Sequence, residues 1–110
     1  MITVPNSFIA TTNAILLAGA KPIFVGIEPE TFNIDTEKIE EMITKRTEAI
    51  LPIHMYGHPC DLKSIMNLVE EHDLKIIVDA AHAVGASYKN KRIGSELTSC
   101  FSFYPTKPMN

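Results

Sequence analysis

The chain has 110 residues, and its 45% hydrophobic content is ordinary for one small soluble domain. Its 13 acidic and 10 basic residues are interspersed and give a net charge of −3, a pattern that argues against DNA, RNA or an anionic membrane surface as a partner. No apolar run approaches the roughly 20 residues that cross a bilayer, and the N-terminus lacks the pattern of a signal peptide, so we expect a cytoplasmic protein.

The chain opens with the end of a strand at 2–5 and then a helical pattern over 8–18. Asn6-Ser7 offers an N-cap for this helix, and Gly19 closes it. Apolar residues cover most of the helix circumference, which predicts that the helix is buried.

Two more strands and two amphipathic helices follow. The strand at 21–27 is an apolar run of the parallel-sheet type, and Asp35 caps the helix after it. The strand at 49–55 contains Pro52, which cannot donate to a ladder and therefore predicts an edge or a bulge. Asp61 caps the third helix.

The last third of the chain contains a buried strand at 75–78, a polar hairpin at 87–94 and a final strand at 100–104. Short apolar strands that alternate with helices predict an α/β fold with a parallel sheet between two helical layers. The pattern starts and stops without the polar capping elements of a closed domain, so we expect residues 1–110 to be a fragment.

The cysteines and histidines give no indication of a cross-link or a metal site. Cys60 and Cys100 are too few for a disulfide framework, and we expect two reduced, packed thiols. His54 and His58 together with Cys60 lack a fourth ligand at a tetrahedral spacing, so we predict no zinc site.

Two strands deliver reactive side chains at their carboxyl ends, where ligands bind in open α/β sheets. Asp79 ends one of them, and Lys107 follows the other. Phe103 and Tyr104 crowd the approach to Lys107 and are expected to desolvate its ammonium, which is how a lysine becomes a Schiff-base nucleophile. The alternative is that Asp79 caps a turn and Lys107 is a solvated surface lysine.

Two runs of sequence carry a resemblance to a known family: FSFYPTK at 101–107 and VDAAHAVGASYKNKRIGS at 78–95. They resemble the core of the DegT/DnrJ/EryC1/StrS sugar aminotransferases, which are fold-type-I enzymes dependent on pyridoxal phosphate. The resemblance extends through 8–35 and 49–66 and so covers most of the chain. It implies the central part of the three-layer α-β-α large domain, without that domain's N-terminal part and without the C-terminal small domain.

The resemblance also implies roles for five residues. Lys107 is the Schiff-base lysine and moves protons, and Asp79 keeps the ring nitrogen of the cofactor protonated. His82 hydrogen-bonds the phenolic oxygen, Phe8 stacks on the exposed ring face, and Ser102 binds the phosphate. A histidine satisfied by backbone in a turn and a phenylalanine packed in the core are the alternatives for His82 and Phe8.

The implied reaction is ping-pong transfer of an amino group from an amino acid, expected to be glutamate, to a nucleotide-linked keto sugar. The full-length form is expected to be a homodimer. A sister group of dehydratases replaces the lysine with histidine, so Lys107 favours amino transfer. The chain departs from the family at Pro108, where asparagine is usual.

Two other classes of protein compete with this interpretation. A dinucleotide-dependent oxidoreductase shares the α/β alternation, but the Gly-rich phosphate turn is missing after the first strand. The second is a truncated, non-catalytic chain or interaction module without bound cofactor. We expect residues 1–110 alone to be inactive.

Overall fold

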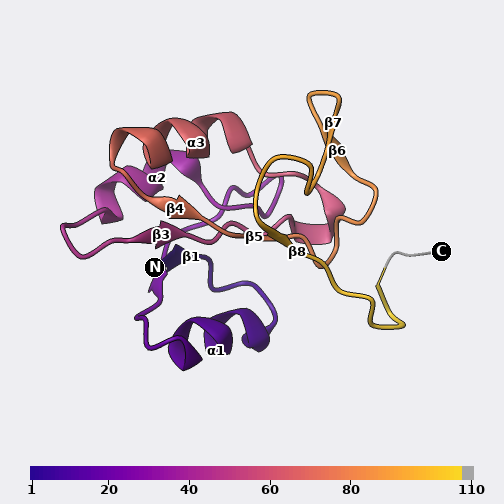
Figure 1. Ribbon diagram of the computed structural model, residues 1–110, viewed down its shortest axis with the longest axis horizontal. Helices are drawn as coiled ribbons and strands as arrows, with labels where there is room; N and C mark the ends of the chain where they lie inside the picture. Colours follow the sequence, from indigo (N-terminus) through magenta and orange to yellow (C-terminus); the bar gives the residue numbers. More distant parts are fainter. Residues whose placement is uncertain (108–110) are drawn as a thin grey trace.

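The computed structural model describes residues 1–107, which form a parallel sheet with helices on both faces (Figure 1). Four parallel strands pair in the order β2-β1-β3-β4. Their bounds are Ile2–Thr3 for β1, Ile23–Phe24 for β2, Ala49–Ile50 for β3 and Lys75–Ile76 for β4. This arrangement confirms the predicted α/β fold with a parallel sheet.

A second parallel pair extends the sheet toward the C-terminus of the chain. It consists of β5, Val78–Asp79, and β8, Ser99–Cys100. A bridge between Ile53 and Asp79 joins this pair to the chain that follows β3. Because β3 lies between β1 and β4, Pro52 is not on an edge strand; the ladder instead breaks there and resumes at Ile53.

The helices lie in two layers. Helix α1, Ile9–Leu17, lies on one face of the sheet, while α2, Thr36–Ile39, and α3, Leu62–Glu71, lie on the other (Figure 1). Two short 3-10 turns, η1 at Glu40–Met42 and η2 at Met55–Gly57, complete the helical elements of residues 1–107.

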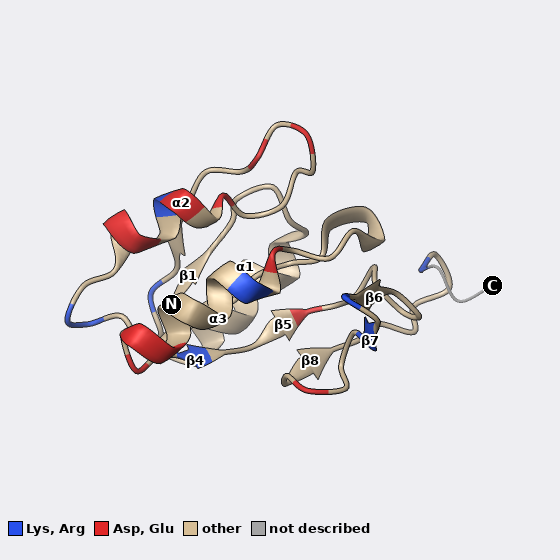
Figure 2. Ribbon diagram, turned by 90° about the horizontal axis from the view of Figure 1, so that it is seen from above, with Lys and Arg blue, Asp and Glu red and all other residues tan. Residues whose placement is uncertain are grey.

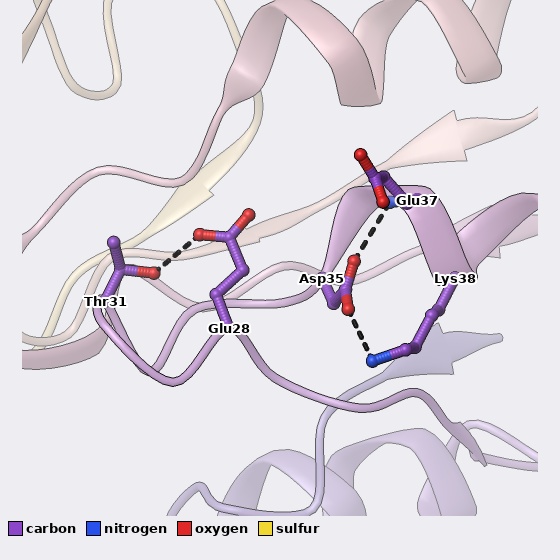
Figure 3. Close-up of polar contacts among 5 residues, drawn as sticks. All are labelled: Glu28, Thr31, Asp35, Glu37 and Lys38. Atoms are coloured by element: carbon purple, nitrogen blue, oxygen red, sulfur yellow. Dashed lines mark hydrogen bonds and ion pairs between the residues drawn. The ribbon is translucent and has the colours of Figure 1, made fainter.

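Aspartate caps start both helices of the α2 and α3 layer, as predicted. Figure 3 shows Asp35 accepting a hydrogen bond from the Glu37 N–H at 3.1 Å and pairing with Lys38 at 2.6 Å. The hydrogen bond from Lys38 lowers the pKa of the Asp35 carboxyl. Asp61 caps α3 by accepting from the Ser64 N–H. These bonds satisfy backbone donors that the first turn of a helix leaves free.

Helix α1 differs from the prediction. Phe8, rather than Asn6 or Ser7, occupies its N-cap, and no side chain caps it. The helix is also not buried: Thr11 and Ile15 pack inward, whereas Leu17 is 89% exposed. The reason is that α1 meets the sheet along one narrow stripe, and none of the described elements covers its outer side.

The hairpin is present and the last strand is shorter than predicted. Strands β6, Ser87–Tyr88, and β7, Lys91–Arg92, are antiparallel, and both residues between them have positive φ, as two-residue hairpin turns require. Strand β8 ends at Cys100, so 101–104 is not strand.

The two thiols lie in different settings. Cys60 is buried, and burial raises the pKa of its thiol to about 12. Cys100 is exposed, so the prediction that both cysteines are packed is wrong for this residue.

Charged residues of both signs are distributed along the chain (Figure 2), although two short elements carry a single sign, acidic in η1 and basic in β7. No helix within residues 1–107 combines the length and the apolar character needed to cross a membrane.

Candidate active site

Asp79 lies at the carboxyl end of β5, and hydrogen bonds hold both of its carboxylate oxygens. One oxygen accepts from the Ala81 N–H at 3.0 Å, and the other accepts from the Thr11 hydroxyl at 2.8 Å. The backbone of Asp79 is fixed as well, because its N–H donates to the Pro52 carbonyl and its carbonyl accepts from the His54 N–H. The carboxylate is therefore held on the face of the sheet that α1 covers.

His82 and Lys107 are in direct contact. Lys107 Nζ lies 2.8 Å from His82 Nε2, although the two residues are 25 positions apart. An ammonium can only donate, so Nε2 accepts from the charged form of Lys107, and the ring proton then lies on Nδ1. A turn closed by the bond from Ala83 N–H to the Ala80 carbonyl presents His82, and a turn closed by the bond from Lys107 N–H to the Tyr104 carbonyl presents Lys107.

The aromatic residues before Lys107 are themselves open to solvent. Phe103 is 72% exposed and Tyr104 is also exposed, whereas Lys107 is half-buried. Strand β8 ends at Cys100, so residues 101–104 do not continue as strand, and His82 is the polar neighbour of Lys107. The desolvation of Lys107 by these rings stays a prediction.

Phe8 is exposed to solvent, and Ser102 forms a local hydrogen bond. Phe8 is 76% exposed at the start of α1, which rules out the alternative of core packing within the described structure. The Ser102 hydroxyl accepts from the Tyr104 N–H at 3.3 Å. Within residues 1–107, no hydrogen bond joins Ser102 to Asp79, His82 or Lys107.

A family model matches the whole chain. The model of the DegT/DnrJ/EryC1/StrS aminotransferase family matches residues 1–110. The chain belongs to this family.

Curated relatives match the chain over most of its length. It is 52% identical over 108 residues to an uncharacterized protein of Methanocaldococcus jannaschii and 45% identical over 109 residues to GDP-perosamine synthase of Caulobacter vibrioides. These alignments cover 97% and 96% of the chain but 28% and 29% of the relatives. The chain thus spans less than a third of their length.

Solved structures of aminotransferases share the fold. Helicobacter pylori PseC, an aminotransferase of pseudoaminic acid biosynthesis, superposes with a TM-score of 0.93 at 39% identity, over 97% of the chain and 29% of PseC. NtdA from Bacillus subtilis, solved with bound cofactor PMP, gives 0.76 at 46% identity over 78% of the chain and 20% of NtdA. These likenesses confirm both the predicted family and the predicted fold class, an incomplete α/β large domain of a fold-type-I aminotransferase.

Two residues of this candidate site were not predicted from the sequence. Thr11 is one, because nothing in the sequence indicates that a helical threonine reaches the end of a strand. Tyr56 is the other: its ring stacks against His82 with 6.4 Å between ring centroids and 8° between planes, and it meets Phe32 edge to face. Its positive φ of 52° is uncommon for a bulky residue.

Gly57 provides the signal that could have drawn attention to this loop. It has a φ of 83°, and a Cβ added there would lie 2.9 Å from the His82 carbonyl oxygen. A glycine next to a tyrosine in the Met55–Gly57 turn therefore allows η2 to approach the turn that carries His82.

His54, whose backbone N–H donates to the Asp79 carbonyl, is fully buried. Its Nδ1 accepts from the Cys60 N–H at 3.1 Å, and Cys60 Sγ donates to the Ile53 carbonyl. Burial lowers the pKa of His54 to about 4, although the charge of Asp79 acts in the opposite direction. The imidazole is therefore neutral near pH 7, and these groups serve the packing of the 53–60 segment.

A cavity of about 420 Å³ lies away from this site, between α3 and the β6–β7 hairpin. Val78 and Leu62 contribute to its lining. Neighbouring residues of a strand point to opposite faces of the sheet, so Val78 faces the cavity while Asp79 faces α1. The cavity and the carboxylate are on different sides of the sheet.

Proposed function

We propose that this chain forms part of the cofactor site of a pyridoxal-phosphate-dependent aminotransferase. In this proposal the enzyme transfers an amino group from an amino acid, glutamate in our expectation, to a nucleotide-linked keto sugar. The observation that carries the proposal is the contact between Lys107 Nζ and His82 Nε2, three residues after Asp79, whose carboxylate is fixed by two hydrogen bonds.

The side chains present fit the chemical requirements of the cofactor. A carboxylate has about four lone-pair positions, and Asp79 uses two of them, so it retains capacity to accept from a protonated ring nitrogen. Lys107 provides an amine, His82 a ring nitrogen for a hydroxyl group, and Phe8 an uncovered aromatic face. When bound, pyridoxal phosphate supplies an electron sink that stabilises negative charge on the substrate carbon that loses its proton.

Asp79 would hold the ring nitrogen by charge. The two hydrogen bonds that its carboxylate accepts come from two different elements, the turn after β5 and helix α1. Hydrogen bonds to a carboxylate favour its ionised form, and an ionised partner keeps a pyridine nitrogen protonated. A neutral amide at this position would not supply that charge.

Lys107 would hold the cofactor aldehyde and move a proton at Nζ. Its partner His82 bonds Lys107 through a ring nitrogen and stacks with one ring face against Tyr56. His82 would therefore orient the amine before the cofactor binds, and would be free to bond the phenolic oxygen once Lys107 has reacted. Phe8 would lie flat against the ring, and Ser102 would contribute to binding the phosphate.

Sugar substrates are supported by the names of the relatives. One relative is named GDP-perosamine synthase, and another, from Escherichia coli, is named dTDP-4-amino-4,6-dideoxy-D-glucose transaminase, at 47% identity over 93 residues, covering 84% of the chain and 25% of the relative. Both names denote amino sugars linked to nucleotides. We extend this substrate class to the complete protein in which the segment acts, and we propose that this protein is a homodimer.

We also propose that residues 1–110 are part of a large domain and are inactive alone. The exposed apolar side of α1 supports this, and so does the half-buried setting of Lys107, since a Schiff-base lysine must be held within about half an ångström of its productive position. Gel filtration of the isolated chain with pyridoxal phosphate should show no retained cofactor. Stoichiometric retention and turnover by the isolated monomer would contradict this proposal.

The test of function uses the complete protein that contains this segment. Apoprotein is mixed with pyridoxal phosphate, passed through gel filtration, and then treated with glutamate. We expect one cofactor per chain to be retained, a spectral change to the pyridoxamine form on addition of glutamate, and amination of a nucleotide-linked keto sugar.

Lysine variants provide the control. Lys107→Ala should abolish the glutamate-dependent spectral change, whereas Lys89→Ala, on the hairpin turn, should preserve it. Absence of retained cofactor in the wild-type protein would favour the non-catalytic alternative. Retained activity in Lys107→Ala would show that the amine has been assigned to the wrong residue.

A further inference from the structure

Thr11 is a buried threonine of α1 whose hydroxyl bonds a residue at the end of β5 instead of the backbone of its own helix. A threonine within a helix can bond the carbonyl of the preceding turn, but Thr11 Oγ1 instead lies 2.8 Å from Asp79 Oδ2. A carboxylate only accepts, so the threonine must donate its single hydroxyl proton to Asp79.

This assignment fixes the direction of a second hydrogen bond. Ser7 Oγ lies 3.2 Å from Thr11 Oγ1, and geometry alone leaves the donor open. Because the Thr11 proton is already used, Ser7 must donate and Thr11 must accept. The three residues form a directed relay from Ser7 through Thr11 to Asp79, in which each donated bond makes the next hydroxyl a stronger donor.

The relay also connects Asp79 to Phe8. The Thr11 N–H donates to the Phe8 carbonyl at 3.1 Å, so both residues lie in the same first turn of α1. Within residues 1–107, segment 6–11 is joined to the rest of the chain by two side-chain hydrogen bonds, one from Asn6 to the Phe32 carbonyl and one from Thr11 to Asp79. Of these two, the Thr11 bond reaches the site.

We propose that Thr11 is a positioning residue of this site: its hydroxyl orients the Asp79 carboxylate and fixes the start of α1, with Phe8, relative to that carboxylate. The inference rests on the proposed function. Two surfaces of one flat ring, its nitrogen edge and its face, would contact Asp79 and Phe8 respectively. Thr11 fixes the positions of Asp79 and Phe8 relative to each other.

The chemical effect follows from the type of bond. A hydroxyl that donates to a carboxylate makes a charge-assisted hydrogen bond, which stabilises the ionised form and restricts the plane of the group. Without it, Asp79 keeps the Ala81 bond on its other oxygen but can rotate about its side-chain torsions. The carboxylate would then be both less well oriented and less well stabilised as an anion.

The test compares four variants of the complete protein: Thr11→Val, Thr11→Ser, Ser7→Ala and Thr12→Val. Valine keeps the shape of threonine without the hydroxyl, serine keeps the hydroxyl, and Thr12 is the adjacent, partly buried threonine of the same helix. The measurements are the dissociation constant of pyridoxal phosphate from the apoprotein, by absorbance, together with kcat and the KM for the sugar.

Thr11→Val should weaken cofactor binding and lower kcat, each by about 10- to 100-fold, the range of a hydrogen bond to a charged group, with little change in the KM for the sugar. Thr11→Ser should restore both values to within about threefold of wild type, and Ser7→Ala should weaken binding by about two- to fivefold. Thr12→Val should match wild type.

Three results would overturn the inference. These are wild-type cofactor affinity in Thr11→Val, an equal loss in Thr12→Val, or failure of serine to restore function, which would assign the effect to packing of the methyl group. If Thr11→Val does not fold, Ser7→Ala decides, and an unchanged affinity there would also overturn it. A wild-type protein that retains no cofactor would instead refute the proposed function.

Discussion

The two faces of the sheet are built in different ways. On one face, α3 starts at an aspartate cap and buries Ile65 completely, together with Val69. On the other face, α1 has no side-chain cap, buries two residues, and leaves Leu17 almost fully exposed. Helix α3 is amphipathic, whereas α1 is apolar on nearly all sides.

The candidate site lies on the less covered face. Asp79 points toward α1 and bonds Thr11, and Phe8 stands exposed at the start of the same helix. The packed face therefore supplies the rigid frame, while the open face keeps side chains available to a ligand. Substitutions on the two faces should consequently affect different properties, stability on one and chemistry on the other.

The largest effect is expected at Asp79. Asp79→Asn in the complete protein should leave the fold largely intact but lower amino transfer by more than about 100-fold, since a neutral amide cannot hold the ring nitrogen protonated. Steady-state turnover and circular dichroism measure the two properties. The control is Asp73→Asn at an exposed position, which should retain turnover. Near-normal turnover with a normal cofactor spectrum in Asp79→Asn would make Asp79 a structural cap.

The packed face should dominate stability. Ile65→Ala removes a fully buried side chain and should lower the free energy of unfolding by about 2–5 kcal/mol, the usual range for such a cavity. Glu70→Ala, at an exposed position of the same helix, should change it by less than about 0.5 kcal/mol. Urea denaturation of the complete protein measures both. Equal losses would show that Ile65 is packed no more tightly than a surface residue.

His54 should make the stability of the frame depend on pH. Its pKa in the folded protein is about 4, below the ordinary 6.5, so the unfolded chain binds a proton more readily. Stability is therefore retained above pH 6.5 and falls as the pH drops toward 4, by about 3 kcal/mol at pH 4 from this residue.

Denaturation profiles of His54→Gln and His58→Gln between pH 4 and 7 test this expectation. The first variant should lose the part of the pH dependence that falls between pH 6.5 and 4, and the second should keep it. An unchanged slope in His54→Gln would mean that the buried imidazole is already protonated or solvated.

The smallest effect is expected at the α3 cap. Asp61→Ala should cost about 1 kcal/mol of stability, the typical value for a lost N-cap, while Asp61→Asn, which can still accept from the Ser64 N–H, should cost much less. Thermal unfolding of both variants measures the difference. Similar losses in both variants would assign the effect to the charge of Asp61 rather than to its cap.

The helices on the packed face could be predicted because each depends on residues close together in the sequence. These residues are the caps at Asp35 and Asp61 and the amphipathic pattern of α3, and the structure confirms each. The burial of α1 was predicted wrongly. An apolar composition indicates that a helix is stabilised by burial, but it does not show whether another element is present to cover the helix.

The candidate site was predicted through family motifs, and its geometry was not. Asp79, His82 and Lys107 were named from the motifs, and the structure brings His82 and Lys107 together. The hydroxyl of Thr11 and the ring of Tyr56 reach the site from distant parts of the chain, so no local pattern identifies them. Strand β8 ends earlier than expected, and the desolvation of Lys107 by Phe103 and Tyr104 stays a prediction.

We propose above that Lys107 is the amine that binds the cofactor. The most direct measurement is to load the complete protein with pyridoxal phosphate, reduce it with borohydride, digest it and locate the label by mass spectrometry. We expect a single pyridoxyl group on the peptide that contains Lys107, and its absence in Lys107→Arg. A label on any other lysine, with Lys107 unmodified, would contradict it.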